Sequence, residues 1–231
     1  LWFHKQHSEA YSYYKVRESG IKTTLKLSAT ERDFYLKLRP ALQGNSLVVY
    51  DIGAATGIVS SCLSKLANVL SIQAFEPIPE VHEQLVENIK HFEKVRCHNV
   101  ALGDRDGTST MYVTNKTDSS SLLPMAKLHQ EQIPEKQLEI THQIQVPVVK
   151  LDDYVREKKL PIPHLVKIDV QGYERNILKG GIETICKAKY CVLEMSFQPL
   201  YEGSPLFDDI YMLMRELGFK LIALTSPLTG S

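Results

Sequence analysis

Short apolar runs alternate with amphipathic stretches along most of the chain. The apolar runs are typical of buried strands, and the stretches between them repeat apolar residues at helical spacing. Strands are predicted at residues 47–50, 69–75, 95–102, 108–114, 144–149, 164–170, 190–195 and 219–224. Helices are predicted at residues 58–67, 81–91, 151–154, 173–188 and 206–217. This alternation predicts an α/β fold, a doubly wound and mostly parallel sheet with helices on both faces.

The N-terminal part of the chain is patterned more weakly. Its first residues show little periodicity, which favours an arm or an irregular cap. Ser28 and Glu31 match a capping box, so we predict a short helix that ends before Pro40. We therefore divide the chain into an N-terminal arm and helical cap, residues 1–45, and a single globular domain, residues 46–231.

One long irregular region interrupts the alternation. Residues 115–143 are polar and contain Pro124 and Pro134, with short helices expected in the middle. Long loops in compact domains are often lids or binding loops. We predict that this segment is a lid-like insertion, in which His129 and His142 are candidate bases, although histidines in polar loops are usually solvated.

A turn that contains glycines follows the first strand of the predicted sheet. It runs through Asp51, Gly53, Ala54, Ala55 and Gly57. A glycine there lets a ligand lie against the backbone, because a Cβ would collide with it. The next strand ends at Glu76 and Pro77, about 20 residues further on, where a carboxylate can accept both hydroxyls of a ribose.

Three interpretations of this turn compete. A nicotinamide or flavin dehydrogenase is disfavoured, because Gly53 and Gly57 do not complete Gly-x-Gly-x-x-Gly and Asp51 would repel a pyrophosphate. S-adenosylmethionine has no phosphate; its ammonium group suits Asp51, its carboxylate suits a helix N-terminus and its ribose suits Glu76. The third interpretation is a glycine turn without any ligand, which the acidic residues on two successive strand ends disfavour.

Other segments resemble the FkbM family of S-adenosylmethionine-dependent methyltransferases. Besides the glycine turn they are residues 74–79, 88–89, 101–104, 119–122, 149–153, 165–174, 194–196 and 217–219. They follow the family's order, and the block from Lys167 to Glu174 is the most specific. The resemblance implies a class I methyltransferase fold with S-adenosyl-L-methionine as cofactor. Members of the family methylate hydroxyl groups of natural products, sugars and polysaccharides.

The polar residues that end the predicted strands are the candidate site residues, because ligands of such sheets bind at the carboxyl ends of the strands. For the cofactor we predict contacts with Asp51, Gly53, Ala54, Ala55, Gly57, Glu76, Pro77, Asn99, Val100, Ala101 and Asp169. The predicted catalytic residues are Asp169 and Glu194, as carboxylates that orient the acceptor or take up its proton. Asp169 has an alternative role as the cap of the helix that starts near Tyr173. Through the resemblance, residues 119–122 form a turn that faces the cofactor or the acceptor.

The chain departs from the family's pattern in two places. The family usually has Asn where Ala55 stands, so we expect only backbone contacts with the cofactor there. Class I methyltransferases normally add one antiparallel strand next to the strand at residues 219–224, and none follows here. We therefore expect an incomplete sheet edge.

Composition narrows the function classes. The chain has 27 basic and 27 acidic residues, and this balance argues against a nucleic-acid binder and against RNA methylation. No apolar run is long enough to cross a membrane. The four cysteines match no metal or redox motif, so we predict no metal site, reduced thiols and a cytoplasmic location.

These observations predict an enzyme that transfers a methyl group from S-adenosylmethionine to a hydroxyl of a small molecule, natural product or sugar. Two alternatives stay open: an NAD-type Rossmann oxidoreductase, and a protein that binds the cofactor without catalysis. A homodimer also stays open.

Overall fold

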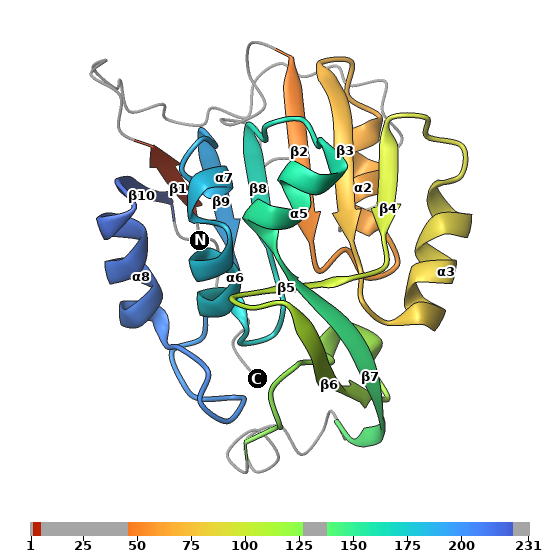
Figure 1. Cartoon of the computed structure of the whole chain (residues 1–231), viewed down its shortest axis with the longest axis vertical. Helices are drawn as coiled ribbons and strands as arrows, with labels where there is room; N and C mark the ends of the chain where they lie inside the picture. Colours follow the sequence, from red (N-terminus) through yellow and green to blue (C-terminus); the bar gives the residue numbers. More distant parts are fainter. Residues whose placement is uncertain (1, 6–45, 127–137, 224–231) are drawn as a thin grey trace, which may run out of the picture.

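A seven-stranded sheet forms the centre of the computed structural model, which describes residues 2–5, 46–126 and 138–223 (Figure 1). In spatial order its strands are β10 (Phe219–Ala223), β1 (Trp2–Lys5), β9 (Tyr190–Leu193), β8 (Leu165–Ile168), β2 (Leu47–Ile52), β3 (Val69–Phe75) and β4 (Val95–His98). β2 pairs in parallel with both β3 and β8, as predicted for the strands that carry Asp51 and precede Asp169. The chain thus has the doubly wound sheet of the class I methyltransferase fold, and the strand order reverses beside β2.

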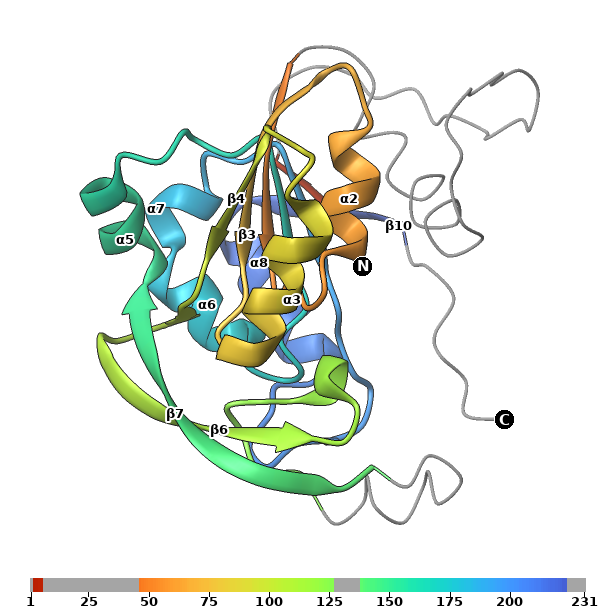
Figure 2. The same cartoon turned by 90° about the vertical axis from the view of Figure 1, so that its right-hand side faces the viewer.

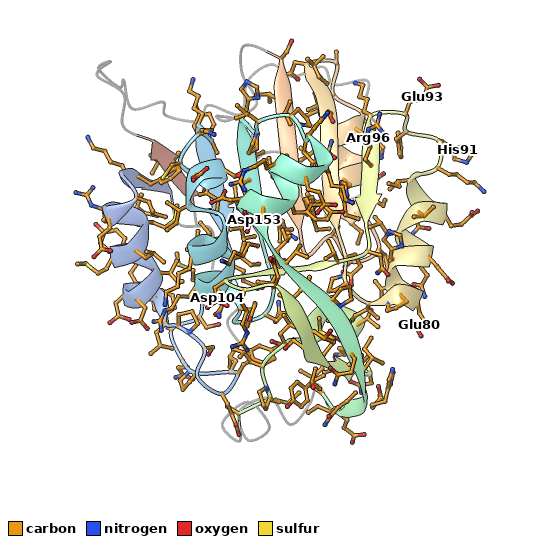
Figure 3. The ribbon with its side chains drawn as sticks, viewed as in Figure 1. Glu80, His91, Glu93, Arg96, Asp104 and Asp153 are labelled. Carbon is orange, nitrogen blue, oxygen red and sulfur yellow. The ribbon has the colours of Figure 1, made fainter. Side chains whose placement is uncertain are left out.

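Helices cover both faces of this sheet (Figure 2). One face carries α2 (Ile58–Ser64) and α3 (Pro79–Ile89); the other carries α5 (Leu151–Lys158), α6 (Glu174–Gly180), α7 (Ile182–Ile185) and α8 (Phe207–Glu216). Side chains alternate along β2, so Val49 packs with Leu63 of α2, and Tyr50 belongs to the cluster that contains Ile177 of α6. Polar side chains such as Glu80 and His91 project outward (Figure 3).

A second, three-stranded sheet lies beyond the carboxyl ends of the central strands (Figure 1). Its order is β5 (Ala101–Gly103), β7 (Ile140–Lys150) and β6 (Gly107–Thr114). The single strand predicted at residues 95–102 is therefore wrong, because β4 and β5 belong to different sheets. Between them the Asn99 side chain donates to the carbonyl oxygens of Glu76 and Pro77, at 2.9 and 3.1 Å, where the chain leaves the central sheet.

The predicted irregular region is shorter than expected. β6 is followed by the 3₁₀ turn η1 (Thr117–Ser119), and β7 already begins at Ile140, where it pairs antiparallel with β6. The short helices were predicted in the middle of residues 115–143, and most of that stretch lies outside the described residues. The small sheet and η1 occupy the place for which the sequence predicted a lid.

Two predictions at the edges of the fold are wrong. The N-terminal arm contains β1, which lies antiparallel between β9 and β10 and pairs Trp2 with Val192 and Phe3 with Leu221. The antiparallel place beside β10 is thereby filled, and the incomplete edge that we expected does not occur. The helix predicted from Ser28 lies outside the described residues.

The long helix predicted at residues 173–188 is divided into α6 and α7. The division falls at Gly181, where a Cβ would approach the Leu151 side chain to 2.7 Å. Within the described part of the chain, no helix has the length and apolar character needed to span a membrane.

Candidate active site

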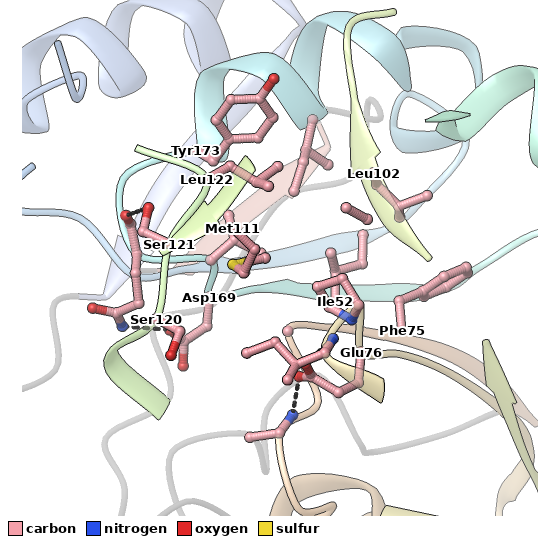
Figure 4. A pocket seen from close by; sticks show the side chains of 18 of the residues that line it. Ile52, Phe75, Glu76, Leu102, Met111, Ser120, Ser121, Leu122, Asp169 and Tyr173 are labelled. Atoms are coloured by element: carbon pink, nitrogen blue, oxygen red, sulfur yellow. Dashed lines mark hydrogen bonds between the residues drawn. The ribbon is translucent and has the colours of Figure 1, made fainter. Parts of the chain in front are cut away.

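A cavity that is open to solvent lies between the carboxyl ends of the central strands and the small sheet. Glu76, Phe75 and Leu102 lie on one side of the cavity, and Asp169 lies on the other with Ser120 and Ser121 (Figure 4). Of the predicted cofactor residues, the cavity is lined by Gly53, Ala55, Glu76, Pro77, Val100, Ala101 and Asp169. Those not among its lining residues are Asp51, Ala54, Gly57 and Asn99.

The glycine turn is required by the protein's own packing. Gly53 and Gly57 have φ values of +75° and +89°, a region that L side chains rarely adopt. A Cβ on Gly53 would come within 1.8 Å of the Asp169 carbonyl oxygen, and one on Gly57 within 2.6 Å of Leu85. Ala55 also has a positive φ, +46°. Asn tolerates this conformation better than Ala does, which gives a backbone reason for the family's usual Asn.

The Glu76 side chain connects the glycine turn after β2 to the turn that precedes α3. Its carboxylate accepts hydrogen bonds from the backbone N–H of Ala55, at 3.0 Å, and of Ile78, at 2.9 Å. Burial raises the pKa of Glu76 to about 7, although both hydrogen bonds and Lys167 act in the opposite direction. Each carboxylate oxygen can accept a further hydrogen bond, so Glu76 can still bind hydroxyl groups in the cavity.

The negative charge of Asp51 is compensated by other groups inside the protein. Its side chain is fully buried, accepts a hydrogen bond from Ser60 Oγ at 2.7 Å and lies 3.3 Å from Lys167 Nζ. The same ammonium group donates to the Gly53 carbonyl oxygen at 2.7 Å. Burial opposes the charge of Lys167, but Asp169 and Asp51 outweigh it and raise its pKa. The structure therefore places Lys167, and not a ligand, next to Asp51.

A pair of carboxyl groups follows β8 and β9. The carboxyl groups of Asp169 and Glu194 are joined through Gln171, whose Nε2 donates to both. Burial opposes the charge of Asp169, but Lys167, 3.5 Å away, and the hydrogen bonds outweigh it and lower its pKa. Burial and the charge of Asp169 raise the pKa of Glu194. Because Glu194 is exposed by surface area, we attribute its shift mainly to Asp169. The opposite directions of the two shifts are those expected of two neighbouring carboxyl groups that share a proton.

Two residues around this pair, Gln171 and Tyr201, were not predicted from the sequence as site residues, whereas Ser121 belongs to the predicted serine turn. Gln171 donates to Asp169 and Glu194 and accepts from Tyr201, and Ser121 donates to the Gln171 carbonyl oxygen. Gln171 stands in the most specific block of the family's pattern, and Ser121 in its serine turn, so the sequence held a signal for both. Tyr201 lies in a loop without any recognised motif.

The alternative role of Asp169 as a helix cap has no support in the structure. No side chain caps α6 at its N-terminal residue, Tyr173. The turn before α6 is instead held by Glu174, which accepts from the N–H groups of Val170, at 3.3 Å, and Gly172, at 3.1 Å. Glu174 therefore has a structural role.

The two candidate histidines do not form part of the described site. His142 is exposed on β7, 2.9 Å from Thr141 Oγ1, and is not among the residues that line the cavity. His129 lies outside the described residues. Ser120, Ser121 and Leu122 do line the cavity, so the serine turn faces the site as the resemblance implies.

Residues 51–221, which hold the whole cavity wall, match the family described as "Methyltransferase FkbM domain". The chain belongs to this family. It is therefore a methyltransferase, and the family implies S-adenosylmethionine as the methyl donor. The residues present fit such a cofactor, because the cavity joins apolar walls at Val100 and Leu102 to the carboxylates of Glu76 and Asp169.

Several characterised enzymes are similar to this FkbM-family chain. The 2-O-methyltransferase NoeI of Sinorhizobium fredii is 30% identical over 76% of this chain and 73% of its own length. The 31-O-demethyl-FK506 methyltransferase FkbM of Streptomyces tacrolimicus is 24% identical over 78% of this chain and 75% of its own length. The hexuronic acid methyltransferase AglP of Haloferax volcanii is 25% identical over 64% of this chain and 55% of its own length.

Proposed function

We propose that this chain is an S-adenosylmethionine-dependent O-methyltransferase that acts on a hydroxyl group of a sugar or natural product. The observation that carries the proposal is the division of the cavity. Glu76 lies on one side, suited to a ribose diol, and Asp169, the partner of Glu194, lies on the other; Glu194 itself is not among the residues that line the cavity. The named activities of NoeI and FkbM, a 2-O- and a 31-O-methylation, support a hydroxyl acceptor.

The cofactor would be held by the backbone around Gly53 and Ala55, by the Glu76 carboxylate and by the walls at Val100 and Ala101. When bound, S-adenosylmethionine supplies an electrophilic methyl group that replaces the hydrogen of the acceptor hydroxyl. The chain's own residues must align that hydroxyl and exclude water, which supply most of the rate in such reactions. The small sheet and η1 wall the cavity and reduce its contact with solvent.

The acceptor hydroxyl also loses a proton, which needs a base. Asp169 is the ionised member of the carboxyl pair, and its side chain is 37% exposed. It can take the proton on its carboxylate, after which both carboxyl groups are neutral. Glu194 already carries a proton and acts by stabilising the charge on Asp169 until that step.

The charge of the cavity favours an uncharged or cationic acceptor. Among the described residues that line it, Glu76, Asp118 and Asp169 are acidic and none is Lys, Arg or His. The cation behind the site, Lys167, is already engaged by Asp51, Asp169 and the Gly53 carbonyl. We therefore expect neutral glycosides to be better acceptors than the uronic acids named for AglP.

The test combines binding with transfer. Calorimetry on the full chain should show binding of S-adenosylmethionine and S-adenosylhomocysteine but not of NAD. Methyl-labelled cofactor should then mark hydroxyls in a panel of neutral glycosides, matched uronides and polyketide alcohols. Binding of NAD alone would support the oxidoreductase, and cofactor binding without transfer to any acceptor would support the non-catalytic alternative.

The remaining expectations stay part of this proposal. We infer one catalytic domain that comprises residues 46–231 and the strand β1 from the N-terminal segment 1–45. Four cysteines without a metal motif favour a reducing compartment such as the cytoplasm. The balanced charge favours an acceptor other than nucleic acid, and we expect activity without a metal. A homodimer stays open.

A further inference from the structure

Gln171 is the point at which the carboxyl pair is connected to the rest of the cavity wall. Its side-chain Nε2 donates to Asp169 Oδ1 at 3.0 Å and to Glu194 Oε2 at 2.6 Å. Its Oε1 accepts from the Tyr201 hydroxyl at 2.9 Å. Its backbone carbonyl oxygen accepts from Ser121 Oγ at 2.7 Å. No function has been given to this residue so far.

The chemistry of the amide matches its partners in the observed orientation. The NH₂ group has two protons and faces two carboxyl groups, whereas Oε1 faces the Tyr201 hydroxyl. Tyr201, which is 3% exposed, lies 2.9 Å from both the Gln171 Oε1 and the Ser119 carbonyl oxygen, and its single hydroxyl proton is shared between them.

The backbone of Gln171 is held in an unfavourable conformation. Its φ is +56°, which costs free energy for any residue with a Cβ and persists only where surrounding contacts offset that cost. A Cβ on the next residue, Gly172, would approach Ser204 and Tyr201 to 2.9 and 3.2 Å. The turn is therefore packed tightly against Tyr201. The Gln171 side chain is held at its backbone by this packing and at its amide group by the hydrogen bonds.

We propose that Gln171 is a positioning residue that clamps the carboxyl groups of Asp169 and Glu194 together and orients Asp169 beside the acceptor. The use of the ionised Asp169 as a base rests on the proposed function. The clamp itself does not, because its contacts lie within this chain. Tyr201 is part of the clamp, because its hydroxyl contacts the amide oxygen.

Several charged or titratable groups face the pair and must be considered with it. From β8, α6 and the loop after β9 they are Lys167, Glu174 and Tyr201. Asp51 of β2 interacts with Lys167, and Asp118 of η1 with Tyr201, so both act on the pair only through these neighbours. Lys167 lies on the Asp169 side, so it determines which carboxyl group is ionised. Gln171 is the residue that hydrogen-bonds both members. The pKa of Asp169 is lowered and that of Glu194 raised, as expected for a shared proton.

The experiment measures the difference between the pKa values of Asp169 and Glu194. Side-chain carboxyl groups of the full chain, labelled with ¹³C in Asp and Glu, are titrated by NMR without cofactor, and Asp169→Asn and Glu194→Gln assign the signals. Gln171→Met keeps the length of the side chain but removes all three side-chain hydrogen bonds. We expect the two apparent pKa values to approach each other by at least one unit. Tyr201→Phe should reduce the difference between the two pKa values by a smaller amount.

Gln145→Met is the matched control, because Gln145 donates one amide hydrogen bond to Thr110 on the small sheet and is not among the residues that line the cavity. It should leave both titrations unchanged. If the difference between the two pKa values is unchanged in Gln171→Met, the proposed role of Gln171 is wrong. If that variant does not fold, an unchanged difference in Tyr201→Phe leads to the same conclusion.

Activity provides the second readout. The acidic limb of the single-turnover pH profile should move up by about one pH unit in Gln171→Met, with cofactor affinity within threefold of wild type. A purely structural role would lower the rate at every pH without moving the limb. Failure of the wild-type chain to bind S-adenosylmethionine would contradict the proposed function and leave the carboxyl titration as the test of the clamp.

Discussion

At the scale of single residues, two carboxylates in one cavity have different partners and therefore different roles. Glu76 accepts hydrogen bonds from two backbone N–H groups on the cofactor side. Asp169 interacts with Lys167, Gln171 and Glu194. We expect substitutions of the two to separate cofactor binding from turnover.

Glu76→Ala should mainly weaken binding of S-adenosylmethionine. Each lost hydrogen bond to a charged group costs about 1.5–3 kcal/mol, which corresponds to about a tenfold to a hundredfold rise in Kd. Asp169→Asn should instead lower the single-turnover rate at saturating cofactor and leave Kd nearly unchanged. Calorimetry and rapid-quench measurements on both variants check this; full turnover in Asp169→Asn would move the search for a base to Glu194.

The strand ends predicted these residues correctly as cavity residues, because the carboxyl ends of parallel strands meet at one edge. The same reasoning misplaced Asp51. Its neighbour Lys167 is two positions before Asp169 on β8 and reaches back across the sheet to Asp51 and Gly53. Such a contact depends on the register of β2 against β8, which local sequence does not determine.

At the scale of elements, the close approach of α6 to β5 joins the two sheets. A Cβ on Gly180 would lie 1.7 Å from the Gly103 carbonyl oxygen. The sequence predicted one long helix through this point, because glycine alone does not reveal which backbone lies beside it. The strand at residues 95–102 was divided for a related reason: the Asn99 side chain anchors the chain where it leaves the central sheet.

Gly180→Ala should therefore destabilise the fold. Inside an ordinary helix, replacing Gly by Ala stabilises by about 1 kcal/mol. Here the added methyl must push α6 away from β5, and such overpacking costs about 1–3 kcal/mol. Urea unfolding followed by circular dichroism measures the difference, with Glu216→Ala as control, because Glu216 is an exposed residue of α8. A Gly180→Ala variant as stable as wild type would show that the contact is not tight.

At the scale of the whole molecule, the sequence predicted the parallel strands of the central sheet but not the antiparallel strand β1. Helical and strand periodicities are local signals, and they located β2, β3, β8 and β9. β1 pairs with strands near the other end of the chain, and pairing at such distance has no local pattern. The small sheet was missed as a unit for the same reason, since β5 joins β7 in parallel across a long stretch of chain.

Buried carboxyl groups also make the stability of the whole fold depend on pH. Burial raises the pKa of Glu174 to about 7, although three backbone hydrogen bonds oppose the shift. The folded chain then binds this proton more tightly than the unfolded chain does, because the pKa of an exposed Glu carboxyl is 4.5. The stabilisation is complete below pH 4.5 and is lost as the pH rises through 7. Glu76 acts in the same direction, and Asp169, with its lowered pKa, acts in the opposite direction at acidic pH.

Glu174→Gln should remove the contribution of one group. A single oxygen, Oε1, accepts the hydrogen bonds from the N–H groups of Val170 and Gly172, so a glutamine carbonyl can replace it without ionising. We expect the variant to match wild type near pH 4.5 and to be more stable above pH 7, by up to about 3 kcal/mol. Urea unfolding at pH 4.5, 6, 7 and 8 measures this, with the exposed Glu183→Gln as control. If Glu174→Gln is less stable than wild type at pH 8, the ionised carboxylate stabilises the turn and its burial carries no penalty.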